Sequence, residues 1–344
     1  MSQFGTKKCR RRADAGGLVH LPPNSDFLSC KELVLPWLSP LELANVSGTC
    51  KVLSRACASI TQRRSLDASR GLEKFSIPFV NSIDPVPYSY FHYAPSQLLH
   101  SLDRQPWGSI GGRPSLPDSP NHLYFETVSD SVTLGCSCER CDNGRSCPCL
   151  RLDGLEGMDA ECGPNCKCEL DCGNRLTQGG ISVKLKIVRV AGKGWGLFAD
   201  QPIREGQFIC EYTGELIMTK EAQRRQQVYD QLARRGHFSS ALLVVREHLP
   251  SGMACLRLNI DATRIGNVAR FINHSCDGGN LSTVLIRSIG ALLPRLCLFS
   301  SKYIGQDEEL SFSYGESRPR PVSDSSLCFC GSSFCSGSLP SEHT

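Results

Sequence analysis

Apolar residues recur at spacings compatible with amphipathic helices through residues 27–62. Ser39-Pro40 interrupts this pattern as a helix start would, with Ser39 as N-cap and Pro40 at the first helical position. We therefore expect a small helical segment within residues 21–70, preceded by a disordered basic tail at residues 1–20.

Beyond residue 180 the pattern changes to short apolar runs separated by glycine turns, which is typical of strands. The first predicted strands are Ile181–Val190, Gly196–Ala199 and Phe208–Tyr212. One helix follows, because the run from Lys220 to Arg235 contains no Gly or Pro, Thr219 can cap its start and Gly236 can end it. Residues 241–316 return to short strands, so the sequence predicts a mostly β protein with some α-helix.

Two further segments are rich in proline and lack helical or strand periodicity. Residues 71–130 combine prolines with aromatic side chains that are costly to leave in water, which favours an extended lead-in packed on another domain. Residues 318–326 have the composition of a flexible linker. We find no internal repeat.

Composition narrows the class of protein only moderately. A chain of 344 residues fits two or three domains, and 40% hydrophobic with 21% charged residues is ordinary for a globular protein. The net charge of +4 is a weak indication of an acidic partner and falls short of a dedicated DNA binder. We expect no membrane partner, because no apolar run of about 18 residues occurs. The basic run 7–12 is a candidate nuclear localisation signal, with a solvated tail as the alternative.

The cysteines change this picture. Of the 20 in the chain, nine lie between residues 136 and 172 and three between 328 and 335. Clustered cysteines at short spacings, without a signal peptide, favour metal sites over disulfides. The block at residues 131–178 contains Cys136, Cys138, Cys141, Cys147, Cys149, Cys162, Cys166, Cys168 and Cys172.

The number nine favours a trinuclear zinc cluster. Three tetrahedral zinc ions need twelve ligand positions, which nine thiolates supply if three of them bridge two metals each. Two separate four-cysteine sites would leave one cysteine over. The alternatives are a disulfide knot and one or two ordinary zinc fingers with spare thiols. Because the block is poor in apolar residues, we expect metal to supply its folding free energy.

This nine-cysteine pattern, which ends in Cys172-Gly173-Asn174-Arg175, resembles the pre-SET motif of SET-domain histone lysine methyltransferases. It is most similar to the suppressor-of-variegation group, including its plant branch. The upstream runs Val80–Pro85 and Phe91–Tyr93 resemble the lead-in of the same group. The resemblance implies a SET fold, with several small sheets and a knot-like core, over residues 179–317.

Three later motifs occur in the order of that family: Gly192–Phe198, Arg270–Cys276 and Glu309–Gly315. The resemblance implies S-adenosylmethionine as cofactor. It assigns cofactor binding to Lys193, Gly194, Trp195, Gly196, Arg270, Asn273, His274 and, in the C-terminal tail, Phe329. It makes Tyr314 the catalytic tyrosine, with Tyr212 and Phe312 in the lysine channel.

The tail at residues 318–344 contains Cys328, Cys330 and Cys335, one ligand short of a closed structural zinc site. In the family the fourth ligand is the cysteine of the Asn-His-Ser-Cys run, here Cys276. The resemblance therefore implies a fourth zinc ion that holds the tail over the active site.

Three positions near the expected lysine channel bear on the chemistry. Ser313 stands where the family usually has Asp, Phe312 is one of the two residues, Phe or Tyr, that the family has at its position, and residues 239–243 lack the family's frequent tyrosine. The last two features enlarge or dry the channel and predict methylation beyond the monomethyl state. The resemblance favours lysine nine of histone three as target, and a nuclear role in chromatin silencing.

Two other functions remain open from the sequence. Leu35 to Leu53 resembles an F-box, so residues 27–62 could dock a ubiquitin-ligase adaptor, or they could form a helical cap on the methyltransferase. A non-catalytic chromatin-binding zinc protein is the other alternative. Such a protein would have no use for Tyr314, Asn273, His274 and Tyr212 together.

Overall fold

The computed structural model forms two compact units that divide after Ile60. The structure describes residues 26–99, 135–141, 147–151, 158–234, 238–248, 255–291, 293–315 and 327–340. The predicted tail at residues 1–20 with its basic run, the lead-in beyond residue 99 and the linker at residues 318–326 lie outside this description.

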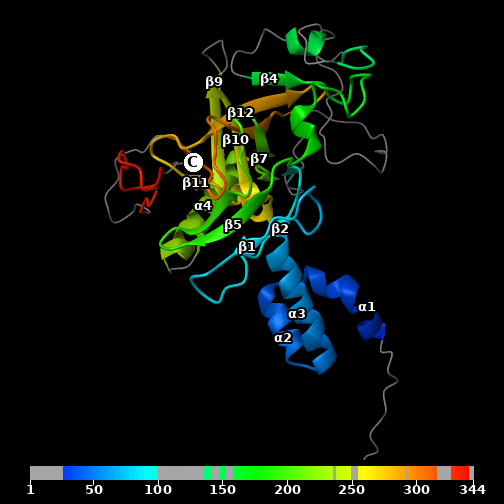
Figure 1. Cartoon of the computed structure of the whole chain (residues 1–344), viewed down its shortest axis with the longest axis vertical. Coiled ribbons are helices and arrows are strands. Elements are labelled where there is room, and N and C mark those ends of the chain that lie inside the picture. Colours follow the sequence, from blue (N-terminus) through cyan, green and yellow to red (C-terminus); the bar gives the residue numbers. More distant parts are fainter. Residues whose placement is uncertain are drawn as a thin grey trace, which may run out of the picture. The chain divides into compact units, whose positions relative to one another are not determined.

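The N-terminal unit is helical, as predicted (Figure 1). Its elements are α1 (Asp26–Val34), η1 (Leu35–Trp37), α2 (Pro40–Ser47) and α3 (Lys51–Leu66), whose last turns pass into the second unit. Ser39 is the N-cap of α2 and forms a capping box with Glu42, in which each side chain bonds the other's backbone nitrogen. Leu35, Leu43 and Ile60 lie in a small apolar core.

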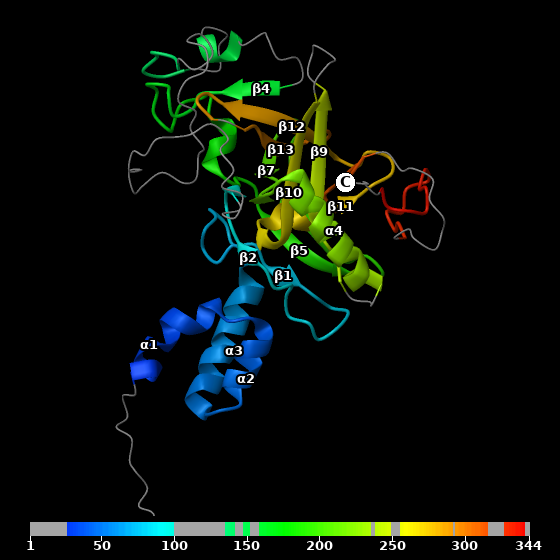
Figure 2. The same ribbon diagram turned by 180° about the vertical axis from the view of Figure 1, so that it is seen from behind.

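In the residues that the structure describes, the second unit consists of strands in four sheets. The strands are β1 (Phe79–Val80), β2 (His92–Tyr93), β3 (Leu98–Leu99), β4 (Met158–Glu161), β5 (Leu185–Val190), β6 (Gly194–Ala199), β7 (Phe208–Glu211), β8 (Gly214–Leu216), β9 (Leu242–His248), β10 (Cys255–Gly266), β11 (Asn273–His274), β12 (Leu281–Ser288), β13 (Arg295–Ser300) and β14 (Ser311–Phe312). The sheet orders are β1-β5-β6, β2-β10-β8-β3 with β9 on β10, β11-β14, and β4-β12-β13-β7. Figure 2 shows β12 between β4 and β13 in the last of these sheets. The mostly β class is thereby confirmed.

One long helix and three short 3-10 turns accompany these sheets in the described residues. They are α4 (Thr219–Arg234), η2 (Pro148–Arg151), η3 (Leu176–Gly179) and η4 (Val268–Phe271). Helix α4 corresponds to the predicted helix, whose end at Arg235 and Gly236 lies outside the described residues. The predicted strand at Ile181 was wrong in its start, because Ile181 and Val183 are buried in the core ahead of the first sheet-paired residue, Leu185.

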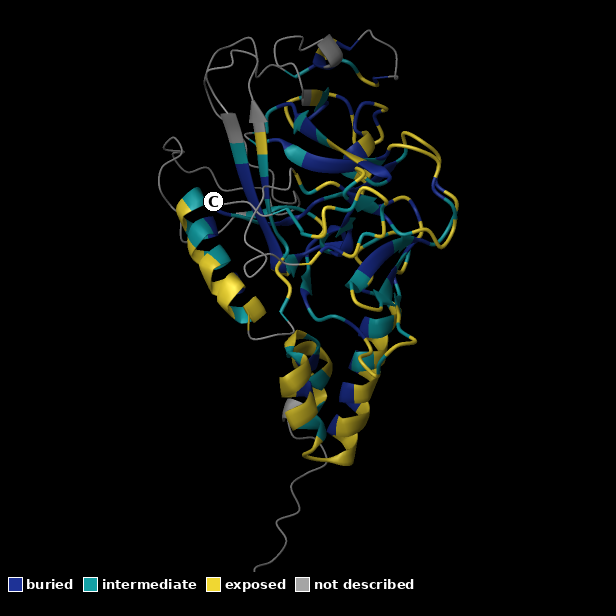
Figure 3. Ribbon diagram, turned by 90° about the vertical axis from the view of Figure 1, so that its left-hand side faces the viewer, coloured by how far each residue is buried: buried dark blue, intermediate teal, exposed yellow. Residues whose placement is uncertain are grey.

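One continuous core holds the sheets of this unit together. Ile187, Leu197, Ile209, Ile260 and Leu298 come from five different strands and are fully buried or nearly so. Figure 3 shows the inner strands buried while α4 is exposed along its outer side. Burying these side chains contributes roughly 1.5–3 kcal/mol each.

The lead-in is part of this unit where the structure describes it. Strands β1 and β2 pair in parallel with β5 and β10, and Phe91 and Ile77 lie in the core. The lead-in therefore packs on the unit that carries the candidate site. In the part of the chain that is described, no helix has the length and apolar character to cross a membrane.

Candidate active site and metal centres

The candidate site is organised where β11 pairs in parallel with β14. Asn273 lies opposite Ser311 and His274 opposite Phe312. Two residues beyond β14, the backbone nitrogen of Tyr314 donates to Nδ1 of His274 at 3.1 Å. This pairing brings the two predicted motifs together across about 40 residues of chain.

Tyr314 is held by its own hydroxyl, which donates to the carbonyl oxygen of Ile272 at 2.5 Å. Its ring lies 5.0 Å from the buried ring of Phe312, between centroids. Burial raises the pKa of the Tyr314 phenol, and the neighbouring Tyr212 raises it further. The phenol is therefore protonated at neutral pH and acts as a neutral hydrogen-bonding group.

Tyr212 follows β7 and approaches the same place from another sheet. Its hydroxyl donates to the carbonyl oxygen of Ala241 at 3.2 Å, which ties the segment before β9 to this wall. Burial raises the pKa of Tyr212 as well, so this phenol also stays neutral. The structure thus places Phe312 next to Tyr314, and Tyr212 next to Ala241 in the segment 239–243, where no tyrosine occurs.

The glycine loop meets Asn273 through a residue that we did not single out from the sequence. Glu309 accepts from Lys193 Nζ at 2.6 Å and from Asn273 Nδ2 at 2.8 Å. The same Asn273 amide donates to the carbonyl oxygen of Trp195 at 3.3 Å. Glu309 lies in the motif Glu309–Gly315, which is the sequence feature that could have pointed to it. Its two partners, Lys193 and Asn273, are distant in sequence.

Two glycines of this loop suit its geometry. A Cβ on Gly196 would lie 2.9 Å from Glu309 Oε1 and 3.1 Å from Asn273 Nδ2, so these two side chains would have to shift. Gly194 has φ +94°, in the left-handed region that other residues rarely adopt. The backbone of this loop therefore comes close to polar side chains, as the binding site of a polar cofactor requires.

Arg270 is placed differently from the other predicted cofactor residues. Its Nε and Nη2 donate to the carbonyl oxygens of Ala262 and Thr263 at 2.9 and 3.1 Å. Its guanidinium also stacks over Phe91 and Phe271, and burial lowers its pKa to about 10. These contacts join β10 to the lead-in, so two of its nitrogens are already used inside the fold.

The nine cysteines of the block converge on one another. The sulfur atoms form four overlapping sets of four, and within each set all atoms lie within 4.8 Å of one another. Together the four sets include all nine cysteines. Cys136 and Cys162 each belong to three of the four sets. Every cysteine whose side chain is described is a free thiol, which argues against a disulfide knot. A converging all-thiolate donor set fits zinc.

The sulfurs of Cys276, Cys328, Cys330 and Cys335 form a separate set of four within 4.8 Å. The distance between Cys276 Sγ and Cys328 Sγ is 3.8 Å. The tail therefore reaches the loop after β11, as expected if Cys276 is the fourth ligand of the tail site. Phe329, between two of these cysteines, leaves 53% of its surface exposed.

His274 connects this thiol set to Tyr314. Because its Nδ1 accepts from a backbone N–H, its proton must sit on Nε2, which faces Cys276 Sγ at 3.3 Å. Burial lowers the pKa of His274, which favours this neutral form. One imidazole thus contacts both the candidate catalytic tyrosine and a candidate metal ligand.

Known proteins resemble this chain, one of them over nearly its whole length. The SET domain family model matches residues 194–315. The histone-lysine N-methyltransferase SUVR3 of Arabidopsis thaliana is 57% identical over 347 residues, which cover 98% of this chain and 97% of that protein.

Two solved structures have a similar fold. The methyltransferase domain of human histone-lysine N-methyltransferase SETMAR has a TM-score of 0.60 and 28% identity, covering 80% of this chain and 97% of that one. KRYPTONITE in complex with mCHH DNA, an H3(1–15) peptide and SAH has a TM-score of 0.58 and 25% identity, covering 80% of this chain and 53% of that one. With identity extending across nearly the whole length of SUVR3, this chain belongs to the SET-domain histone-lysine N-methyltransferases.

Proposed function

We propose that this chain transfers methyl groups to a lysine of a histone tail, with lysine nine of histone three as the target, and that it acts on chromatin in the nucleus. The observation that carries the proposal is the convergence of Tyr314, Tyr212 and the Asn273-His274 pair on one site. The relatives support the substrate class, since SUVR3 is named as a histone-lysine methyltransferase and KRYPTONITE was crystallised with an H3 peptide.

S-adenosylmethionine, when bound, supplies the methyl group on a sulfonium. We assign its binding to the loop Lys193–Gly196 and to Asn273 and His274, whose side-chain and backbone groups meet beside the tyrosines. We assign Arg270 to the same set by its motif, and its bonds to Ala262 and Thr263 give it a supporting role there. Phe329 is assigned to the adenine, which its exposed ring can cover.

The substrate lysine must arrive as a neutral amine, although a free lysine has a pKa of about 10.4. A channel of Phe312, Tyr212 and Tyr314 disfavours the ammonium form by desolvation, so the proton can leave through water. Because the Tyr314 phenol keeps its proton and its hydroxyl is fixed on Ile272, its oxygen can orient the amine. The protein's main contribution is then alignment of the reacting atoms.

We assign three zinc ions to the nine-cysteine block and one to Cys276, Cys328, Cys330 and Cys335. The overlap of the sulfur sets supports shared ligands in the first site, and the isolated set of four supports a closed site in the second. The second site would hold the tail next to His274.

The test is methyl transfer from labelled S-adenosylmethionine to recombinant core histones. Tyr314→Phe removes only a hydroxyl and is expected to lower kcat by about 100-fold or more. Tyr303→Phe is the matched control, because Tyr303 is exposed and outside the site, and it should keep wild-type activity. Equal activity of Tyr314→Phe and wild type would refute the assignment of the site.

The adaptor role of residues 27–62 stays a prediction. Leu33, Trp37 and Leu41 are exposed on the helical unit, which supports a protein-binding face there. A pull-down with the ubiquitin-ligase adaptor, using wild type and Trp37→Ala, tests it. If the wild type does not capture the adaptor, the prediction of an adaptor role for these helices is wrong.

A further inference from the structure

The run Val80–Pro85 lies outside the residues assigned to cofactor, catalysis or zinc, although its sequence resembles the family's lead-in. It begins in β1, where Val80 pairs in parallel with Val188 of β5. Strand β5 pairs in turn with β6, which starts at Gly194 in the loop assigned to the cofactor. The lead-in therefore belongs to the sheet that carries this loop.

The pairing of β5 with β6 sets an arginine beside the loop. Arg189 lies directly opposite Trp195, so their side chains share one face of the sheet. The guanidinium carbon of Arg189 is 5.4 Å from the centre of the Trp195 ring, within cation–π distance. Its Nη1 would lie 3.8 Å from a Cβ on Gly194. One arginine thus lies beside two of the residues assigned to cofactor binding.

Asp84 of the lead-in holds this arginine. The Nε of Arg189 donates to Asp84 Oδ2 at 3.1 Å. The other carboxylate oxygen, Oδ1, accepts from Asn81 Nδ2 at 2.7 Å and from the Val86 backbone nitrogen at 2.9 Å. The bond from Val86, and then the one from Asn81, lowers the pKa of Asp84 below its ordinary value. The carboxylate is therefore charged at neutral pH and is held in place by its own turn.

Phe79 adds a second contact between the lead-in and the loop. Its ring meets the Trp195 ring edge-on, with 5.2 Å between the centroids. It also lies 5.8 Å from the ring of Phe271, which belongs to the motif Arg270–Cys276. Asn273 of that motif donates to the carbonyl oxygen of Trp195. The lead-in thus contacts both cofactor motifs, and Trp195 is the residue at which these contacts meet.

The loop has little stiffness of its own. Gly192 and Gly194 have φ of +77° and +94°, and Gly196 follows two residues later. Glycine loses more conformational freedom on ordering than any other residue. Trp195, between two of these glycines, is the large side chain by which this backbone can be held. Fixing a loop in its binding form beforehand lowers the conformational cost of binding.

We propose that Asp84 is a positioning residue for the cofactor loop. It fixes Arg189 over Trp195, and this contact holds the backbone of residues 192–196 in the form that binds S-adenosylmethionine. The inference rests on the function proposed above and gives the lead-in a part in cofactor affinity. Because Asp84 acts through Arg189 and not on the reacting atoms, its loss weakens cofactor binding and spares the chemical step.

The first test is calorimetric titration of the zinc-loaded full chain and its Asp84→Asn variant with S-adenosylhomocysteine. The asparagine oxygen can still accept from Asn81 and Val86, but an amide now faces Arg189, so the ion pair alone is lost. Affinity should fall about three- to tenfold, as for a partly exposed ion pair together with a cation–π contact. The KM for S-adenosylmethionine should rise by the same factor, with kcat and the KM for a histone H3 peptide within about twofold. A fall in kcat at unchanged cofactor affinity would overturn the proposal.

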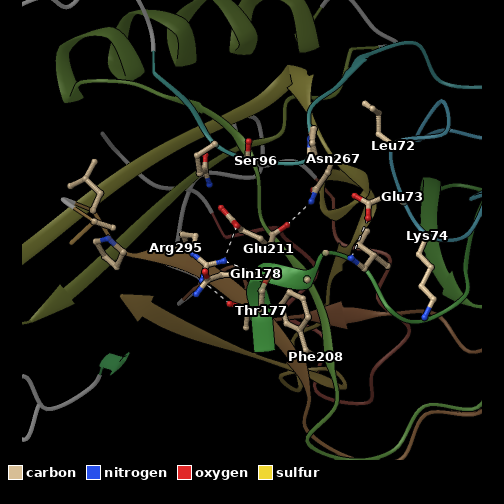
Figure 4. A pocket seen from close by; sticks show the side chains of 18 of the residues that line it. Leu72, Glu73, Lys74, Ser96, Thr177, Gln178, Phe208, Glu211, Asn267 and Arg295 are labelled. Atoms are coloured by element: carbon tan, nitrogen blue, oxygen red, sulfur yellow. Dashed lines mark hydrogen bonds and ion pairs between the residues drawn. The ribbon is translucent and has the colours of Figure 1, made fainter. Parts of the chain in front are cut away.

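Glu73→Gln is the matched control, because it makes the same change of carboxylate to amide elsewhere in the lead-in. Glu73 accepts from the Tyr93 hydroxyl at 2.6 Å. It lines a cavity whose described walls include no residue of the cofactor loop (Figure 4). This variant should bind S-adenosylhomocysteine within about twofold of wild type. Equal losses in Asp84→Asn and Glu73→Gln would mean that Asp84 has no special role.

A double variant shows whether Asp84 acts through Arg189. Asp84→Asn combined with Arg189→Met should lose no more affinity for S-adenosylhomocysteine than Arg189→Met alone, since the two residues act as one unit. Additive losses would contradict the proposed route. If Asp84→Asn is poorly folded by circular dichroism, Arg189→Lys replaces it, because lysine keeps the charge but lacks the Nε donor and the planar guanidinium. Wild-type affinity in Arg189→Lys would then overturn the proposal.

Hydrogen exchange of the cofactor-free chain measures the loop itself. Backbone amides of residues 192–196 should exchange faster in Asp84→Asn than in wild type, whereas Glu73→Gln should match wild type. This measurement needs neither cofactor nor substrate, so the two levels of the argument can fail separately. No binding of S-adenosylhomocysteine by wild type would refute the proposed function. Equal exchange of this loop in Asp84→Asn and wild type would refute the role of Asp84.

Discussion

At the scale of single residues, His274 has two neighbours that determine its form. It accepts from the Tyr314 backbone at Nδ1 and faces Cys276 with Nε2. A side chain that hydrogen-bonds a metal ligand orients that ligand and is itself oriented by it. We therefore expect the tail site and the position of Tyr314 to depend on each other through this ring.

Replacing His274 by Ala should affect both sides. We expect kcat to fall by about 10- to 100-fold, as for residues that support metal ligands. One zinc ion per chain should also be released faster to a chelator, while the other three stay bound. The measurements are methyl transfer and chelator-monitored zinc release. His92→Ala, which removes a partly buried imidazole next to Tyr90, is the control, and identical zinc release from both variants would contradict the expectation.

Phe312 carries the expectation about the product. Its ring is buried 5.0 Å from Tyr314, where a tyrosine would add a hydroxyl to the channel. Phe312→Tyr should therefore shift the product toward monomethyl-lysine, while wild type goes beyond it. Mass spectrometry of a histone H3 peptide after full turnover measures this. A wild-type reaction that stops at the monomethyl state would show the prediction to be wrong.

The sequence was informative about which residues carry motifs but not about all of their contacts. Asn273, His274 and Tyr314 could be named because they lie in recognisable runs. Glu309 could not be given a role, because Lys193 and Asn273, which it joins, are 116 and 36 residues away. Side-chain contacts between distant segments depend on the sheet pairing, which hydrophobic periodicity alone does not specify.

At the scale of elements, α4 is fixed to the sheet by one arginine. Arg225 donates to Glu215 on β8 and to Asp261 on β10 at 2.7 Å each, and to Glu221 within the helix at 2.8 Å. The Tyr229 hydroxyl adds a bond of 2.8 Å to Asp261. In Figures 1 and 2, α4 lies alongside β10. The helix is strongly polar, so this ion network matters more than apolar burial for its attachment.

Replacing Arg225 by Met should leave Asp261 buried without its cation. Breaking a buried ion pair in this way typically costs about 3–5 kcal/mol. Arg224→Met is the control, because Arg224 is exposed and water screens its pair with Glu221, which therefore contributes little to stability. Denaturant unfolding gives both free energies, and hydrogen exchange should show the loss in α4 first. A cost for Arg225→Met no larger than for Arg224→Met would exclude this role of the network.

Elements were predictable to the extent that local signals mark their ends. The break at Ser39-Pro40 was correct because a capping box is a local device. The strand at Ile181 was placed too early because buried side chains in a loop have the same apolar pattern as a strand. The partners of β1 and β2, which join the lead-in to β5 and β10, depend on tertiary packing and had no signal in the sequence.

At the scale of the whole molecule, the cysteine-rich part has buried thiols where the other parts have an apolar core. The block has its own cluster of buried groups, consisting almost entirely of cysteines with Ile289. Counting thiols from the sequence predicts three zinc ions with three shared ligands, but it does not say which thiols are shared. Cys136 and Cys162, which each belong to three of the four overlapping sulfur sets, are our candidates for two of the bridging thiolates.

Zinc content tests this assignment directly. The purified chain should hold four zinc ions by elemental analysis, and Cys330→Ser should hold three. Cys162→Ser should lose more than one ion, because a bridging thiolate serves two metals, whereas Cys138→Ser, found in a single sulfur set, should lose at most one. Cys57→Ser, in the core of the helical unit, should retain all four. Equal losses from Cys162→Ser and Cys138→Ser would mean that Cys162 does not bridge, and two ions in wild type would mean that the block holds no trinuclear cluster.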